Sequence, residues 1–149
     1  MRTMVLSILI DNTPGALSRV VGLFSRRGYN IDSLTVGETE NPAVSRMTVA
    51  VTGDKIILDQ IEKQISKLEN VIEVKELTGD ASVCRELILV KVAAAQEARP
   101  SINAIVEIFR AKIVDVASDT MMIELTGNQA KLDAFTKLLD GYEIKELVR

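Results

Sequence analysis

The fold is decided by residues 4–28, which read MVLSILIDNTPGALSRVVGLFSRRG. Apolar residues alternate with their neighbours over Met4–Ile10, and this period of two is that of a pleated strand. The period then changes to that of a helix. One helical face is predicted to carry Leu17, Val20, Val21 and Phe24. The stretch therefore predicts a strand, a short loop and a helix.

Residues that start and stop helices flank this helical pattern. Asn12 or Thr13 can cap the helix, and Pro14 suits its first position because the missing N–H would have no partner there. Gly28 is placed to end it.

The residues up to position 77 extend the pattern to a complete small unit. Two further strands are predicted at Ile31–Val36 and Arg46–Val51, joined by a hairpin around Glu38–Ala43. A second helix is predicted to carry Leu58, Ile61, Ile65 and Leu68. Val71–Leu77 forms the last strand, with Ile72 and Val74 expected on one side and Glu73 and Lys75 on the other.

A second copy of this pattern follows in the chain. Moving the apolar positions of the first helix by 85 gives another apolar set ending in Phe109, and Thr52-Gly53 recurs as Thr126-Gly127. The second copy is predicted as Glu86–Val92, a helix through Ile102–Arg110, Ile113–Ala117, Thr120–Leu125, a helix at Lys131–Leu139 and Tyr142–Val148. Each copy reads βαββαβ, so the predicted fold class is α+β, with two ferredoxin-like units.

The predicted boundary gives units 1–78 and 79–149, joined by a linker at Thr78–Val83. Both helices of such a unit cover one face of its sheet, so the other face is left without local cover. The residues expected on that second face or at an edge are Val5, Leu9, Leu87 and Leu89. A unit of this size has a marginal core, and this favours association with another copy or a partner.

Composition limits the function classes. Hydrophobic residues make up 47% of the 149 residues, the formal net charge is −3, and no basic arm for nucleic acid is present. No stretch has the length and apolarity of a signal peptide or a membrane span, and the single Cys84 fits a cytoplasmic location. The chain contains no histidine, which excludes Ser-His and Cys-His pairs and histidine metal sites. An independent enzyme would have to rely on carboxylates, lysines or a cofactor, and no cluster in the sequence is arranged for that. We therefore predict no catalytic residues and no metal site.

The loop between the first strand and the first helix is the candidate binding site. A helix N-terminus offers free N–H groups to a carboxylate, and Gly15 lets a ligand approach the backbone. Asn12 and Asn30 could contact the ammonium and carboxylate of an amino acid. The residues alone leave open a purely local role, in which Asn12 caps the helix and Asn30 makes a turn.

Several runs of the sequence resemble one known family. The first block comprises Asn12-x-Pro14-Gly15-Ala16-Leu17-Ser18-Arg19-Val20, Gly22–Ile31, Ser33–Val36 and Ser45–Thr48. Further matches are Gln60–Gln64, Arg85–Leu87, Leu89–Lys91 and Glu107–Arg110. Together they resemble the small, regulatory subunit of acetolactate (acetohydroxyacid) synthase over essentially the whole chain.

The resemblance implies an N-terminal ACT domain, which binds an amino-acid effector and forms a homodimer, and a C-terminal ferredoxin-like domain. It implies a non-catalytic subunit that activates a catalytic large subunit and confers feedback inhibition by valine or another branched-chain amino acid. Thiamine diphosphate, Mg²⁺ and FAD are expected on that large subunit, and no cofactor on this chain. The implied effector contacts are Asn12, Gly15, Ala16, Leu17 and Ser18, with Asn30 and Ile31 from the facing chain.

The resemblance also implies a short tail after Arg149, where this chain ends. The alternative function is a stand-alone ACT-type amino-acid sensor that acts on another enzyme or a regulator. No helix-turn-helix or basic stripe in the sequence supports contact with DNA.

Overall fold

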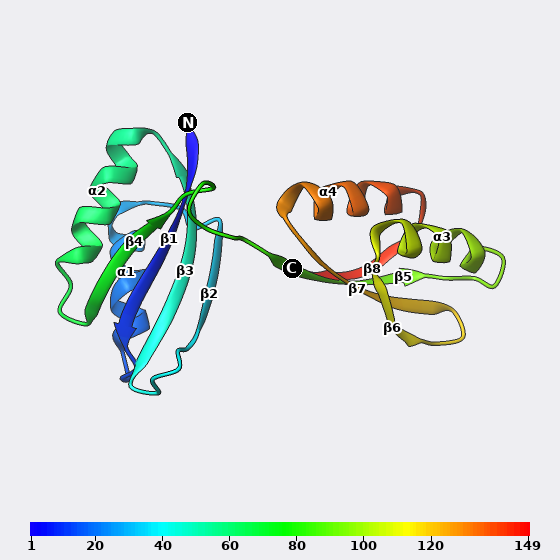
Figure 1. Ribbon diagram of the computed structural model, residues 1–149, viewed down its shortest axis with the longest axis horizontal. Coiled ribbons are helices and arrows are strands. Elements are labelled where there is room, and N and C mark those ends of the chain that lie inside the picture. The colour runs from blue at the N-terminus through cyan, green and yellow to red at the C-terminus, as the bar shows by residue number, and fades with distance from the viewer. The chain divides into compact units, whose positions relative to one another are not determined.

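The computed structural model describes residues 1–149, which divide into two compact units, Met1–Ser82 and Val83–Arg149 (Figure 1). The predicted boundary lay four positions earlier, after residue 78. Both positions fall in the segment between the last strand of the first unit and the first strand of the second, which contains no helix or strand. Each unit encloses a hydrophobic core of its own.

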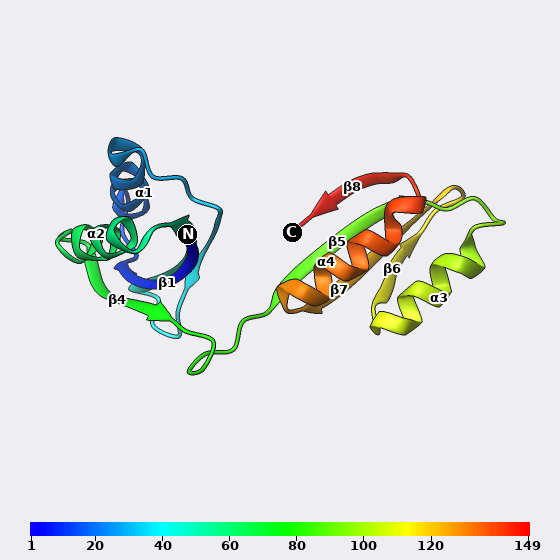
Figure 2. The ribbon, with the colours of Figure 1, turned by 90° about the horizontal axis from the view of Figure 1, so that it is seen from above.

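The first unit has the predicted order βαββαβ. Its elements are β1 (Arg2–Asp11), α1 (Ala16–Arg27), β2 (Ser33–Glu38), β3 (Val44–Gly53), α2 (Lys55–Ser66) and β4 (Val71–Leu77). The four strands form an antiparallel sheet in the order β2-β3-β1-β4, so β2 and β4 are its edges. Both helices lie on the same side of this sheet (Figure 2).

The second unit repeats the arrangement. Its elements are β5 (Glu86–Ala93), α3 (Arg99–Phe109), β6 (Lys112–Val116), β7 (Thr120–Gly127), α4 (Gln129–Leu138), the short 3₁₀ turn η1 (Leu139–Gly141) and β8 (Ile144–Val148). The strand order β6-β7-β5-β8 is the equivalent one, with β6 and β8 at the edges. The predicted fold class is thus confirmed.

Buried and exposed side chains alternate along the central strands, and the buried ones form the core between the sheet and the helices. Met4, Leu6, Ile8 and Ile10 of β1 are all buried, whereas the residues between them are at least partly exposed. The intervening Val5 and Leu9 pair with Ala50 and Arg46 on the face away from the helices, as the sequence predicts. On the corresponding face of the second unit, Leu87 is exposed and Leu89 is partly buried.

Helix α1 begins later than predicted, at Ala16, and Gly15 is the residue that precedes it. Gly15 has a φ of 86°, a left-handed conformation that glycine adopts without steric cost. The Thr13 N–H donates to Asp11 O and the Ala16 N–H donates to Thr13 O, so a tight turn occupies the residues predicted to start the helix. The prediction of an Asn12 or Thr13 cap with Pro14 at the first helical position is therefore wrong.

The end of the first unit also differs from the prediction in two details. Helix α2 ends at Ser66, so Leu68 lies in the turn that follows, where it packs against the core. The register of β4 shifts opposite Leu9 and Ile10, because the strand bulges at Ile72. Val71 and Val74 therefore face the core, while Ile72 is 55% exposed.

The repeat is real, but its helical register is not the predicted one. After α1, the N–H of Tyr29 donates to Phe24 O, and after α3, the N–H of Ala111 donates to Val106 O. Phe24 and Val106 are therefore equivalent, and they lie 82 positions apart. The predicted shift of 85 instead paired Leu23, which is 7% exposed, with Ile108, which is 72% exposed. The equivalence of Thr52-Gly53 and Thr126-Gly127, which are 74 positions apart, is confirmed, because the residues that follow, Asp54 and Asn128, cap α2 and α4 in the same way.

Candidate functional site

The loop that leads into α1 leaves backbone N–H groups without partners. No side chain caps α1, and no backbone carbonyl accepts the N–H of Gly15, Leu17 or Ser18. The N–H of Ala16 is used by Thr13, and the Ala16 side chain is buried in the core. By contrast, Asp54 and Asn128 accept N–H groups at the starts of α2 and α4. The mouth of α1 therefore presents three N–H donors, together with the positive end of the helix dipole.

Asn12 is anchored to the β2–β3 hairpin. Its backbone N–H donates to Ala43 O at 2.9 Å, and its side-chain Nδ2 donates to Pro42 O at 2.8 Å and to Glu38 Oε1 at 3.2 Å. These bonds hold the loop against the end of β2. The sequence offers no signal for this contact, since the two segments are separated by the whole of α1 and β2.

Asn30 and Ile31 lie between α1 and the start of β2. The Asn30 Nδ2 donates to Asp32 Oδ1 at 3.1 Å, and the Asp32 Oδ2 accepts from Thr52 Oγ1 at 2.7 Å. Asn30 is exposed, while Ile31 is partly buried and packs against the core.

Within one chain, the candidate residues form two groups at opposite ends of α1. Asn12, Gly15, Ala16, Leu17 and Ser18 lie at or just before its start, whereas Asn30 and Ile31 follow its end. A helix of 12 residues is about 18 Å long at roughly 1.5 Å per residue. One chain therefore does not bring the two asparagines together.

In the second unit, the start of the corresponding helix α3 also has no side-chain cap, but the loop before it is built differently. Arg99 donates from Nε to Ala94 O, and from one terminal nitrogen to Ala117 O at 2.7 Å and Ser118 O at 2.9 Å. Ala98 precedes α3 in a right-handed conformation, and no glycine opens this loop. The Arg99 side chain thus ties the start of α3 to the β6–β7 turn.

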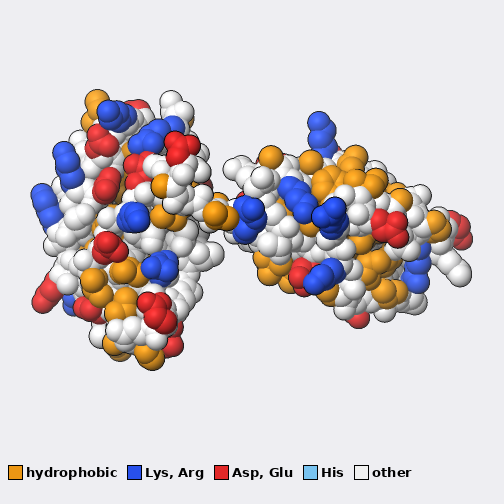
Figure 3. All heavy atoms as spheres, in the orientation of Figure 1, with side chains coloured by type: hydrophobic (Ala, Val, Ile, Leu, Met, Phe, Trp, Pro, Cys, Tyr) orange, Lys and Arg blue, Asp and Glu red, His pale blue; other side chains and the backbone are white.

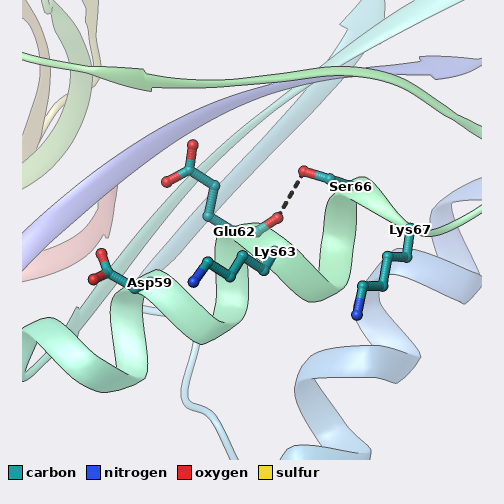
Figure 4. A pocket seen from close by; sticks show the side chains of 5 residues that line it. All are labelled: Asp59, Glu62, Lys63, Ser66 and Lys67. Carbon is teal, nitrogen blue, oxygen red and sulfur yellow. Dashed lines mark hydrogen bonds between the residues drawn. The ribbon is translucent and has the colours of Figure 1, made fainter.

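The structure shows little else that could form a site. A surface hollow on α2 is lined by Asp59, Glu62, Lys63 and Ser66 of this helix and by Lys67, which directly follows it (Figure 4). Its only bond among these side chains runs from Ser66 Oγ to the backbone carbonyl of Glu62, at 2.8 Å. No group of three or more Cys, Asp or Glu side chains is arranged to hold a metal ion. No helix is both long and apolar enough to cross a membrane.

Two βαββαβ units, the first with an uncapped and glycine-opened helix mouth, define a protein of the ACT type, the class of small regulatory domains. Residues 6–73 match the family described as "AHAS small subunit-like ACT domain", where AHAS is acetohydroxyacid synthase. Residues 85–149 match the family described as "Small subunit of acetolactate synthase".

Whole-chain relatives agree with both matches. The chain is 49% identical over 148 residues to a probable acetolactate synthase small subunit of Methanothermobacter thermautotrophicus, and the match covers 99% of this chain and 88% of that one. It is 48% identical over 146 residues to the acetolactate synthase isozyme 3 small subunit of Escherichia coli, covering 97% and 90% of the two chains.

A solved structure extends the likeness to three dimensions. The crystal structure of an acetolactate synthase small subunit from Thermotoga maritima shares 41% identity and a TM-score of 0.90, and covers 99% of this chain and 92% of that one. The chain belongs to the family of acetolactate synthase small subunits, and its role is that of a regulatory subunit. Partnership with the catalytic large subunit follows from this membership.

Proposed function

We propose that this regulatory subunit binds free valine, or another branched-chain amino acid, and inhibits its large subunit in response. The effector contacts are Asn12, Gly15, Ala16, Leu17 and Ser18 of one chain, together with Asn30 and Ile31 of a second copy. The observation that carries the proposal is the set of unpartnered N–H groups at the mouth of α1. A carboxylate is the natural ligand for such donors.

The free edge of β2 supports a site shared between two copies. β2 is an edge strand, and all six of its residues are exposed. Two such edges related by a two-fold axis would run antiparallel, so the start of one β2 would meet the end of the other. Asn30 of one chain would then lie near the Asn12 loop of its partner. This pairing unites the two groups of residues that a single chain separates.

The same edge supports an apolar seam for the branched side chain of the effector. Leu34 and Val36 of β2 pair with the buried Val49 and Met47, so they lie on the helix side of the sheet. Both are exposed nonetheless, because β2 lies at the edge of the sheet. Leu17 at the start of α1 is also exposed. An isopropyl group could cover such residues where two chains meet.

A bridging ligand can act as an inhibitor without altering any catalytic group. Valine that contacts both chains binds their paired arrangement better than any other, and this difference in affinity shifts the population of conformations. A coupling free energy of about 1–3 kcal/mol changes a partner's activity several-fold.

The catalytic centre belongs, in this proposal, to the large subunit, which also holds thiamine diphosphate, Mg²⁺ and FAD. This chain supplies no cofactor site and works in the cytoplasm, where its single exposed Cys84 can stay reduced.

The test is reconstitution with a homologous acetolactate synthase large subunit. We expect this chain to raise the rate of acetolactate formation and to make that rate fall as valine is added. Calorimetry on the chain alone should detect valine binding, with leucine and isoleucine as comparisons. The proposal fails if no branched-chain amino acid binds and none changes the activity of the complex.

A further inference from the structure

We infer that Asp32 and Glu38 are positioning residues that orient the two site asparagines, so that both present carbonyl oxygens to the α-ammonium of the effector. Asp32 directly precedes β2, and Glu38 is its last residue. The inference rests on the proposed function, since it assigns roles within the same effector site.

The Asn12 amide is oriented by two acceptors. Its neighbours at hydrogen-bond distance are Pro42 O and the Glu38 carboxylate. A carbonyl and an ionised carboxylate can only accept hydrogen bonds, so the amide nitrogen must face them. The carbonyl Oδ1 of Asn12 makes no hydrogen bond within the chain and remains available to a donor.

The Asn30 amide is oriented by one acceptor, which is itself held in place. Asp32 Oδ1 accepts from Asn30 Nδ2 at 3.1 Å, while Asp32 Oδ2 accepts from Thr52 Oγ1 at 2.7 Å. The Thr52 hydroxyl is also 2.9 Å from the Thr3 hydroxyl, on the neighbouring strand β1. The backbone N–H of Asp32 donates to Ala50 O at 2.8 Å, which fixes the residue at the start of β2. Asn30 Oδ1 makes no hydrogen bond within the chain, and the bond to Asp32 turns it away from that carboxylate.

The two free amide oxygens would distinguish ligands by the number of hydrogen-bond donors that each ligand carries. An ammonium group carries a positive charge and three N–H donors, whereas a hydroxyl has only one donor. Two oriented carbonyl oxygens, one from each chain, would favour an amino acid over the hydroxy acid with the same carbon skeleton. A site preorganised for particular donors rejects a ligand that lacks them.

The two positions differ in how much each carboxylate matters. Asn12 keeps Pro42 O as an acceptor at 2.8 Å when Glu38 is removed, but Asn30 has no second acceptor when Asp32 is removed. Replacement of Asp32 should therefore weaken valine binding more than replacement of Glu38.

The experiment measures the affinities for valine and for 2-hydroxyisovalerate by calorimetry on the full chain. We expect Asp32→Ala to weaken valine binding by roughly 3- to 10-fold, the effect of one ordinary hydrogen bond, and to leave the hydroxy acid nearly unaffected. Asp32→Asn keeps an acceptor oxygen for Asn30 and should restore most of the loss. Glu40→Ala is the matched control, because Glu40 is an exposed carboxylate of the same hairpin that makes no hydrogen bond.

Each contrary result identifies what is wrong. If Asp32→Ala weakens both ligands equally, or changes neither, Asp32 does not orient Asn30 toward an ammonium. If Asp32→Asn is as damaging as Asp32→Ala, the carboxylate charge acts directly and the positioning role is overturned. If the unmodified chain binds neither ligand, the proposed function fails and this inference fails with it.

Discussion

Among single residues, Gly15 combines two properties that separate substitutions can distinguish. Its φ of 86° is costly for any residue with a Cβ, and an added Cβ would meet no atom within 4 Å. The penalty of a small side chain there is thus conformational and not steric. A charged side chain would in addition place its carboxylate beside the free N–H groups of α1.

We predict that Gly15→Asp abolishes valine inhibition of the reconstituted synthase and leaves activation of the large subunit largely intact. The aspartate would occupy the donors meant for the effector's carboxylate and repel it. Valine titrations of synthase activity provide the measurement. Gly15→Ala carries the conformational cost, about 1–2 kcal/mol, without the charge, and should retain part of the inhibition. Normal inhibition in the Gly15→Asp protein would place the effector elsewhere.

The sequence identified this loop as a candidate site but did not reveal its conformation. Asparagine before Pro-Gly is a good helix cap by composition, and nothing local indicates that Asn12 donates to Pro42 and Glu38 instead. Those partners depend on how the hairpin folds back, which is a tertiary property. Asp32 could not be identified for the same reason, since its bond to Thr52 on β3 joins residues that are far apart in the sequence.

Among the elements, α1 buries a face that differs by a few residues from the predicted one. Ala16, Val20, Leu23 and Phe24 are buried, whereas Leu17 is 40% exposed. Two leucines on one helix therefore lie in contrasting environments, and they form a matched pair for a test of this face.

We predict that Leu23→Ala lowers the free energy of unfolding of the first unit by about 2–5 kcal/mol, the usual cost of truncating a buried leucine. Leu17→Ala should cost less than about 1 kcal/mol, because much of that side chain is already in water. Urea unfolding followed by a probe in the first unit compares the two. Equal losses would contradict the helical face seen here.

The last strand of the second unit is tied down by an ion-pair cluster. Arg149 donates to both carboxylate oxygens of Glu86, on β5, and to Asp133 Oδ1, on α4. These hydrogen bonds raise the pKa of the Arg149 guanidinium above its ordinary value, so the group stays charged throughout the accessible pH range. The Arg149 side chain is still 30% exposed, so water and salt weaken its ion pairs.

We predict that Arg149→Ala lowers the stability of the second unit by about 1 kcal/mol, and that the loss shrinks in high salt. Lys145→Ala is the control, because the Lys145–Glu143 pair on the same strand region is more exposed and joins near neighbours. Thermal unfolding at low and high ionic strength provides the comparison. A loss that is independent of salt would mean that packing of the arginine stem, and not its charge, is responsible.

Most elements could be predicted because their apolar periods are clear, but register could not. The apolar pattern of α1 also matches α3 when it is shifted by three residues, because three positions are nearly one helical turn. For this reason the sequence predicts a spacing of 85 residues between equivalent positions of α1 and α3, whereas the structure has 82. The bulges at Ile72 and Lys145 escaped prediction because a strand pattern does not show where the partner strand skips a residue.

For the whole molecule, the proposed homodimer makes the edge of β2 the decisive surface. Hydrophobic side chains are visible on the surface of both units (Figure 3), and the exposed ones include residues of the edge strands. Val36 on β2 is 42% exposed, and Val116 on β6 is 52% exposed. They face the helix side of equivalent edge strands, so they are suitable for the same substitution.

We predict that Val36→Asp converts the dimer to monomers and removes the valine response, since two like charges would face each other in an apolar seam. Val116→Asp should leave both properties unchanged. Sedimentation velocity gives the oligomeric state, and circular dichroism checks that each variant is folded. A Val36→Asp protein that stays dimeric and responsive would exclude pairing through β2.

The difference between the starts of α1 and α3 has a consequence for the stoichiometry of effector binding. Only the first unit has a left-handed glycine before its first helix, whereas Arg99 fastens the equivalent loop of the second unit to the β6–β7 turn. A titration should therefore saturate at one equivalent per polypeptide, although the fold is present twice. Any sigmoidal dose–response would then have to originate between polypeptides, because a lone one has no second receptor with which to cooperate.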